Sequence, residues 1–129
     1  MPCPFCDRIA KADHSAESIH AVAIEDEYPL SRGHTLVVPR RHVASVYDLS
    51  SEEQADVWAL AERVRSDLVG SVAPDGFTIG VNDGTAAGQT IPHAHVHVIP
   101  RFAGDVPDPR GGVRWVIPSK APYWNDGDD

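Results

Sequence analysis

The sequence predicts a single α+β domain, and three features of the chain support this. Short apolar segments, either continuous or alternating with polar residues, predict strands at 21–24, 35–38, 77–81 and 93–99. One long amphipathic helix is expected after Ser50, and a short helical turn near the N-terminus. Residues 1–129 have the size of one domain without repeats or a linker, and an acidic tail at about 124–129 is expected to be flexible.

The composition is that of a soluble globular protein, with 42% hydrophobic and 23% charged residues. No apolar run is long enough to cross a bilayer, and the N-terminus lacks a signal-peptide pattern. We therefore expect a cytoplasmic protein without a membrane partner. The net charge of −8 argues against a nucleic-acid partner, although local basic residues could still bind a phosphorylated small molecule.

The predicted helical turn at residues 3–12 carries Cys3 and Cys6 on nearly one face. In a cytoplasmic chain, Cys-x-x-Cys is typical of metal or redox ligands rather than of a structural disulfide. Two cysteines provide half of a tetrahedral zinc site, so distant histidines would have to supply the other ligands. Two free thiols near a chain end are the alternative.

An acidic turn separates the first two predicted strands, at 21–24 and 35–38. This turn contains Asp26, and Pro39 closes the second strand. His34 and His42 flank that second strand. By residue type alone, each of them could equally be a half-buried histidine bonded to a backbone carbonyl, and the acids could equally form a solvated bend.

The long helix is predicted to begin after Ser50, because Ser50 and Glu53 have the spacing of a capping box. Its apolar residues recur at helical spacing and form one stripe, made of Val57, Leu60, Ala61, Val64 and Leu68. Gly70 is expected to end the helix. The helix is interpreted as scaffold.

Three histidines at alternate positions make the last predicted strand the most informative one. His93, His95 and His97 should leave one face of it, while Ala94, Val96 and Val98 face the core. Pro92 and Pro100 bracket this segment. A glycine-rich turn with Asn82, Gly88, Gln89 and Thr90 precedes it, and its backbone N–H groups can face an anion.

Three adjacent imidazoles suit either metal binding or nucleophilic and acid–base catalysis at phosphorus. The spacing alone leaves open a mononuclear three-histidine metalloenzyme and a plain histidine-rich surface strand. The polar, glycine-rich loop directly upstream favours phosphate chemistry.

Taken together, these segments resemble the histidine-triad (HIT) superfamily. The resemblance is carried by His-Ala-His-Val-His at 93–97, by the Asn-Asp-Gly and Gly-Gln-Thr segments before it, and by Gly33 through His42. Cys3-Pro4-Phe5-Cys6 looks like the opening of many bacterial members. The matches cover most of residues 3–101 in the family's order.

The resemblance implies a HIT-like antiparallel sheet with one main helix, usually in a homodimer. It implies nucleotide hydrolysis or transfer at an α-phosphate, closest to bacterial dinucleoside polyphosphate hydrolase-like proteins. His95 would attack phosphorus to form a nucleotidyl-histidine, and the carbonyl of His93 would hold its other ring nitrogen. The remaining implied site residues are His34 and His97 in the catalytic group, Asp26 for ribose hydroxyls, and Asn82, Gly88, Gln89 and Thr90 for ribose and phosphate.

The resemblance also makes His42 the third zinc ligand. His93 opens the histidine strand and is the candidate fourth ligand of a structural zinc site with Cys3 and Cys6. A divalent cation could accompany a bound polyphosphate. His97 stands where transferase-type members carry Gln, which favours a hydrolase; a phosphoramidase and a non-catalytic nucleotide- or zinc-binding module are the alternatives.

After Arg101 the sequence pattern loosens. Arg110 and Arg114 could bind distal phosphates, and a surface loop that pairs with its own domain is the alternative. Residues 115–117 could add an edge strand.

Overall fold

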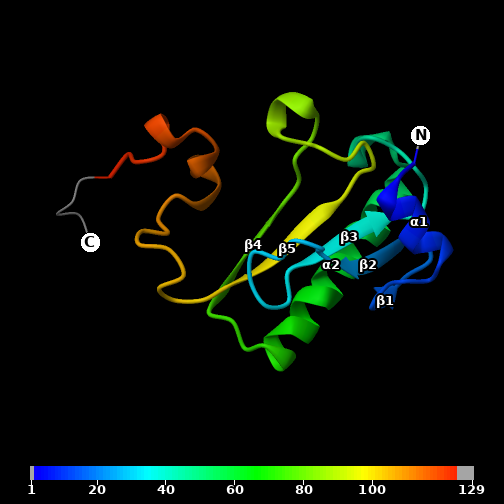
Figure 1. The fold of residues 1–129 in the computed structure, drawn as a ribbon, viewed down its shortest axis with the longest axis horizontal. Helices are drawn as coiled ribbons and strands as arrows, with labels where there is room; N and C mark the ends of the chain where they lie inside the picture. Colours follow the sequence, from blue (N-terminus) through cyan, green and yellow to red (C-terminus); the bar gives the residue numbers. More distant parts are fainter. Residues whose placement is uncertain (1, 125–129) are drawn as a thin grey trace.

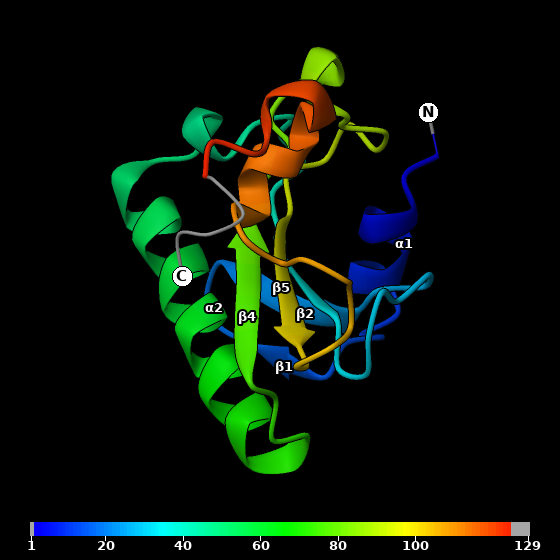
Figure 2. The same cartoon turned by 90° about the vertical axis from the view of Figure 1, so that its left-hand side faces the viewer.

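The computed structural model describes residues 2–124, which fold into a five-stranded antiparallel sheet with helices on both faces (Figures 1 and 2). The strands are β1 (Ala16–Glu17), β2 (Ala21–Glu25), β3 (Thr35–Pro39), β4 (Gly76–Gly80) and β5 (Val96–Arg101), and the helices are α1 (Pro4–Ala10) and α2 (Ser51–Ser71). The strand order is β1-β2-β3-β5-β4. The predicted α+β class is confirmed. Of the expected acidic tail, residues 125–129 lie outside the described part of the chain.

The two faces of the sheet bury different side chains. Ala21, Ala23 and Val37 pack with α2 on one face, whereas Val22 and Ile24 pack with α1 on the other. Figure 2 shows α2 and α1 on opposite sides of the strands. Because both faces are covered, β2 and β3 are continuous apolar runs rather than alternating ones.

Helix α2 begins as predicted. The Ser50 hydroxyl accepts from the Glu53 N–H at 3.1 Å, and the Glu53 carboxylate accepts from the Ser50 N–H at 3.0 Å. The predicted end at Gly70 is wrong, because the helix continues through it to Ser71. The Val72 N–H still bonds to the Leu68 carbonyl, which carries the last turn beyond the glycine.

The histidine strand is shorter than the sequence suggests. β5 begins at Val96, because the preceding Ala94 N–H bonds to the Val43 carbonyl in a loop rather than to a strand. Pro100 lies inside β5 instead of closing it. It is tolerated there because β3 pairs with β5 only as far as Val98, so at Pro100 the strand has a neighbour on one side, β4.

The segment after β5 turns away from the sheet and is drawn in orange and red in Figure 1. The expected edge strand at residues 115–117 is wrong, because Gly112–Val116 is a 3₁₀ turn and Pro118–Lys120 is another. Two left-handed glycines, Gly111 and Gly112, start this coil, and Pro118 cannot continue a strand. Within residues 2–124, no helix has both the length and the hydropathy required to cross a membrane.

A single glycine sets the approach of the β2–β3 loop to the helix. Gly33 has a φ of +86°, and a Cβ atom there would lie 2.8 Å from a methyl group of Leu68. Only glycine meets both conditions without strain. The next residue, His34, is thereby delivered to the start of β3 on the face opposite α2.

Candidate functional site

Three distant parts of the chain meet on the sheet face opposite α2. The β2–β3 loop supplies Asp26 and His34, the segment after β3 supplies His42, and the stretch leading into β5 together with the start of β5 supplies the three alternating histidines. Helix α1 adds Cys6, and Cys3 is the N-cap residue of the same helix. The structure groups these side chains into two clusters: the sulfur cluster (Cys3, Cys6, His42, His93) and the carboxylate cluster (Asp26, His34, His97). His95 lies between them in sequence.

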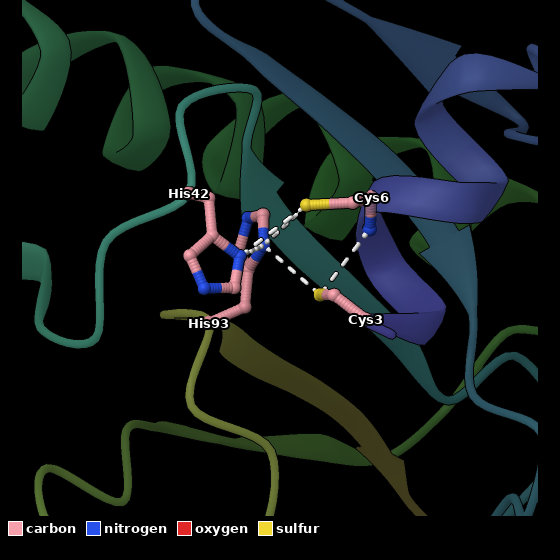
Figure 3. A group of neighbouring side chains, drawn as sticks. All are labelled: Cys3, Cys6, His42 and His93. Atoms are coloured by element: carbon pink, nitrogen blue, oxygen red, sulfur yellow. Dashed lines mark hydrogen bonds between the residues drawn. The ribbon is translucent and has the colours of Figure 1, made fainter. Parts of the chain in front are cut away.

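In the sulfur cluster, four side chains from α1, the post-β3 loop and the pre-β5 loop point at one centre (Figure 3). The Cys3 and Cys6 sulfurs each lie 3.5 Å from His93 Nδ1, and the Cys6 sulfur lies 3.3 Å from His42 Nδ1. The two Nδ1 atoms are 3.1 Å apart. In tetrahedral zinc sites, the Zn–S and Zn–N bond lengths put ligand atoms about 3.3–3.8 Å from one another.

The donor chemistry of this cluster also fits a metal ion. His93 Nε2 donates to the Pro39 carbonyl at 2.8 Å, which leaves the lone pair of Nδ1 directed at the two sulfurs. Both cysteines are free, and the Cys6 N–H donates to the Cys3 sulfur at 3.4 Å. Burial and the adjacent Cys3 raise the pKa of the Cys6 thiol, and a positive charge beside it would favour the thiolate. The four predicted ligands therefore converge and can hold a zinc ion.

His95 is buried and held by backbone. Its Nδ1 lies 2.9 Å from the carbonyl oxygen of His93, the residue that also points at the sulfur cluster. Its ring lies edge-on to the ring of His97, with centroids 5.1 Å apart. One backbone carbonyl thus links the orientation of His95 to the position of His93.

The carboxylate cluster contains two neutral imidazoles. His34 Nε2 lies 3.0 Å from His97 Nδ1 and 3.3 Å from an Asp26 oxygen. Burial lowers the pKa of His34, and the Asp26 carboxylate opposes this shift only in part. Burial, then repulsion from His95 and His34, lowers the pKa of His97 to about 4. Near pH 7 both rings are therefore uncharged.

The glycine-rich loop that was predicted to bind phosphate is held together by Gln89. Its side-chain oxygen accepts from the Gly84 N–H at 2.9 Å, and its amide nitrogen donates to the carbonyls of Ala44 and Ile91 at 2.8 and 3.0 Å. In this structure both amide hydrogens are used within the protein. The other three predicted residues, Asn82, Gly88 and Thr90, lie on the exposed surface of the loop.

Arg110 and Arg114 contact their own C-terminal segment. The Arg110 guanidinium bonds to both carboxylate oxygens of Asp108 at 3.1 Å and lies 4.6 Å from the centre of a Trp124 ring. Arg114 donates to two backbone carbonyls and lies 4.7 Å from a Tyr123 ring. The predicted contact with distal phosphates stays a prediction.

Phe5 is a site residue that the sequence analysis overlooked. Its ring lies edge-on to His95 at 5.0 Å and to His93 at 5.8 Å, measured between centroids. The available signal was its place between the two cysteines, where a large apolar side chain must enter the core beside whatever those cysteines bind.

The comparisons with known proteins agree with this geometry. A family model described as the HIT domain matches residues 10–104. The chain belongs to the HIT family. An uncharacterized HIT-like protein of Mycobacterium tuberculosis is 41% identical over 108 residues, which cover 81% of this chain and 75% of that protein. The crystal structure of a zinc-bound histidine triad family protein from Mycobacterium smegmatis has a TM-score of 0.71 at 37% identity, covering 84% of this chain and 85% of that one.

Two further HIT relatives have named activities. The bis(5′-adenosyl)-triphosphatase of Dictyostelium discoideum is 45% identical over 73 residues, which cover 57% of this chain and 49% of that enzyme. The adenosine 5′-monophosphoramidase of Schizosaccharomyces pombe is 35% identical over 105 residues, which cover 78% of this chain and 75% of that enzyme. These HIT relatives act on nucleotides, which supports nucleotide hydrolysis as the general class of activity.

Proposed function

We propose that this HIT protein is a hydrolase or transferase acting at the α-phosphate of dinucleoside polyphosphates or related nucleotides. The main support for this proposal is the 2.9 Å contact between His95 Nδ1 and the His93 carbonyl oxygen. Because a carbonyl oxygen only accepts, Nδ1 carries the proton and Nε2 keeps its lone pair. A buried imidazole oriented in this way is suited to nucleophilic attack on phosphorus.

The proposed reaction has two steps at His95. In the first, the Nε2 lone pair forms a bond to the α-phosphorus, and the bond from that phosphorus to the bridging oxygen breaks, its electron pair leaving with the departing phosphate. In the second, water forms a new bond to phosphorus, the N–P bond breaks, its electron pair returns to Nε2, and the proton of the water passes to solvent. A transferase would use another nucleophile in place of water.

The other predicted residues would bind the nucleotide around His95. Asp26 would accept from ribose hydroxyls, and His97, with His34 behind it, would contact phosphate oxygens. The loop of Asn82, Gly88, Gln89 and Thr90 would bind ribose and phosphate, partly through backbone N–H groups. Arg110 and Arg114 would reach the distal phosphates, where a divalent cation could also bind.

We further infer a structural zinc site at Cys3, Cys6, His42 and His93. The converging donor atoms and the zinc-bound Mycobacterium smegmatis relative support it. When bound, zinc would cross-link α1 to the segment that carries His95, and no catalytic step would pass through it. We also expect the protein to form a homodimer.

A nucleoside phosphoramidase is the second candidate. The Schizosaccharomyces pombe monophosphoramidase aligns with more of this chain than the Dictyostelium discoideum triphosphatase does, 78% against 57%. Both activities would use the same attack by His95. They differ in the leaving group, which is a phosphate in one case and an amine in the other.

The decisive experiment is incubation of the purified protein with a panel of dinucleoside polyphosphates and nucleoside phosphoramidates in ¹⁸O-labelled water. Attack by water on a nucleotidyl-histidine predicts one ¹⁸O atom in the nucleoside monophosphate product. His95→Ala should lower kcat by a factor on the order of 10⁴ or more, while nucleotide binding persists.

His20→Ala is a matched control, because His20 lies outside both clusters, near Glu52. It should keep wild-type turnover. A His95 variant with near-wild-type rates would rule out the covalent mechanism. Stoichiometric nucleotide binding without any turnover would instead identify a non-catalytic binding module.

A further inference from the structure

Backbone groups determine which nitrogen of each site imidazole carries the proton. A neutral imidazole has one N–H and one lone pair, so a fixed partner on one nitrogen decides what the other offers. Burial lowers the pKa of His34 and that of His97, so both rings are neutral near pH 7. His93 donates to the Pro39 carbonyl and therefore offers a lone pair.

His34 is bonded in the opposite sense. The backbone N–H of Leu30 lies 3.0 Å from His34 Nδ1 and can only donate. Nδ1 therefore keeps its lone pair, and the proton of this ring must sit on Nε2. That nitrogen faces His97 Nδ1 at 3.0 Å and Asp26 at 3.3 Å, so the N–H points into the carboxylate cluster.

The tautomer of His34 determines that of His97. Because His34 Nε2 donates across the 3.0 Å contact, His97 Nδ1 has to accept, and the His97 proton sits on Nε2. His97 therefore offers an N–H from its outer nitrogen. The neighbouring His95, whose Nδ1 donates to a carbonyl, offers a lone pair.

We propose that the Leu30 amide is a positioning group that locks His34, and through it His97, in the Nε2–H tautomer. His97 then presents a hydrogen-bond donor to a bound anion, and the carboxylate cluster is not a second metal site.

The composition of the cluster would by itself suggest a metal ion. Its three donor atoms lie within 4.8 Å of one another, and two imidazoles with a carboxylate form a common transition-metal site. A metal ion on His34 Nε2 would move the proton to Nδ1, where it would oppose the Leu30 N–H. A backbone donor would lose its acceptor and face a second hydrogen, which disfavours the metal-bound form.

The loop that carries Leu30 is built to hold this amide in place. The Asp26 N–H bonds to the His34 carbonyl at 3.1 Å, and the His34 N–H bonds to the Ser31 carbonyl at 3.2 Å. Asp26 also accepts from the Tyr28 N–H at 2.8 Å. Leu30 is 76% exposed, so the contribution of this residue to the site is its N–H rather than its packing.

The consequence for catalysis rests on the proposed function. As His95 Nε2 bonds to phosphorus, His97 Nε2–H would donate a hydrogen bond to the phosphoryl or leaving-group oxygen and keep its proton. A polyphosphate leaving group gains stabilisation from such a donor without having to be protonated.

The tautomers can be measured directly on the resting protein by ¹⁵N-histidine NMR, with assignments from His34→Gln and His97→Asn. We expect unprotonated Nδ1 and protonated Nε2 in both rings, with a scalar coupling between His34 Nε2 and His97 Nδ1. A proton on His34 Nδ1 overturns the proposal. Because no substrate is involved, the spectrum stands even if the protein turns over no nucleotide.

Leu30 permits a matched pair of variants. Leu30→Ala keeps the amide and should retain the wild-type spectrum, whereas Leu30→Pro removes the N–H and should give mixed His34 tautomers. Relative to Leu30→Ala, Leu30→Pro should lower kcat about three- to tenfold, as expected for one hydrogen bond. If both variants keep the wild-type spectrum, the amide has no such role. If Leu30→Pro does not fold, the ¹⁵N spectrum of the wild type still tests the proposal, because it shows which nitrogen of His34 carries the proton.

Metal stoichiometry provides an independent test. With excess Zn²⁺, native mass spectrometry should show one ion per chain, lost in Cys3→Ser with Cys6→Ser. A second ion that persists in that double variant and disappears in His34→Gln would assign the carboxylate cluster to metal and overturn the proposal.

Discussion

The sulfur cluster and the carboxylate cluster each contain two histidines, and they differ in their remaining ligands and in the backbone group that holds one histidine of each. His93 donates to a carbonyl at 2.8 Å, whereas His34 accepts from an amide at 3.0 Å. The first arrangement directs a lone pair at two thiols. The second directs a proton at a neighbouring imidazole and a carboxylate.

Under the proposed assignments, residue composition alone does not separate a metal site from a proton-donating one. Both clusters bring three or more potential ligands within 4.8 Å. What separates them is the polarity of one main-chain contact on the far side of a ring. His95 follows the carbonyl pattern and therefore resembles His93 in offering a lone pair, although we propose that it attacks phosphorus.

Of the two clusters, the carboxylate cluster should show the larger effect when it is disrupted by His97→Asn. The variant should lose about 10²–10³ in kcat, the range for removing one preorganised hydrogen-bond donor to developing negative charge. It should also unfold less readily in acid than the wild type does. His97 has a pKa of about 4 in the fold against an ordinary value of 6.5, so its contribution to stability is complete above pH 6.5 and is lost as the pH falls toward 4.

Urea unfolding between pH 4 and 7 measures how steeply the free energy of unfolding falls as the pH is lowered. Zinc content, measured on the same variant, tests whether the sulfur cluster is affected as well. His34 also has a lowered pKa, and His95, His34 and Asp26 face His97, so a shallower slope should remain in the variant. Unchanged metal content with reduced kcat would separate the two clusters. Loss of zinc from His97→Asn would show that they are not independent.

Breaking the sulfur cluster should affect stability more than chemistry. Cys3→Ser with Cys6→Ser should bind no zinc and lower the melting temperature by about 5–10 °C, equivalent to roughly 2 kcal/mol of lost metal linkage. The fall in kcat should be about tenfold, because the metal acts only through the orientation of His93. Calorimetry with metal analysis, in protein without a histidine tag, measures both. A metal-free wild type of equal stability contradicts the prediction.

The sequence predicted the scaffold well where hydrophobic periodicity is strong. The capping box at Ser50, the apolar stripe of α2 and the inward-facing Ala94, Val96 and Val98 all appear in the structure. The predicted edge strand at residues 115–117 was wrong because the left-handed glycines before it and the proline after it outweighed its strand-forming side chains. The predicted end of α2 at Gly70 was wrong because a helix that is stabilised by packing tolerates a glycine near its end.

The site was predictable to the level of residue type. Motif spacing indicated the cysteines and histidines, and the structure brings Cys3, Cys6, His42 and His93 together as expected. The Pro39 carbonyl and the Leu30 amide could not be predicted, since every residue except proline carries both groups and only the fold decides which one meets a ring. The same holds for Gln89, whose side-chain amide accepts from the Gly84 N–H of its own loop and donates to the Ala44 carbonyl in the segment after β3.

The smallest expected effect tests the link between the sulfur cluster and His95. Phe5 is buried, lies between the two cysteines in sequence, and packs edge-on against both His93 and His95. Phe5→Leu keeps most of the apolar volume but removes the aromatic contact, which is worth about 0.5–1.5 kcal/mol. Since this contact orients the proposed nucleophile, kcat should fall about two- to tenfold while zinc content and the His34 tautomer stay unchanged.

Val22→Ala is the matched control, because Val22 is buried in the same core as Phe5 and lies on β2 rather than among the histidines. It should lower the free energy of unfolding by about 1–3 kcal/mol, as expected for a small core cavity, and leave kcat unchanged. If Phe5→Leu changes stability alone, as Val22→Ala should, Phe5 is a packing residue and the sulfur cluster reaches His95 only through the His93 carbonyl. A fall in kcat at full zinc occupancy would show that α1 carries a second, aromatic contact to the nucleophile.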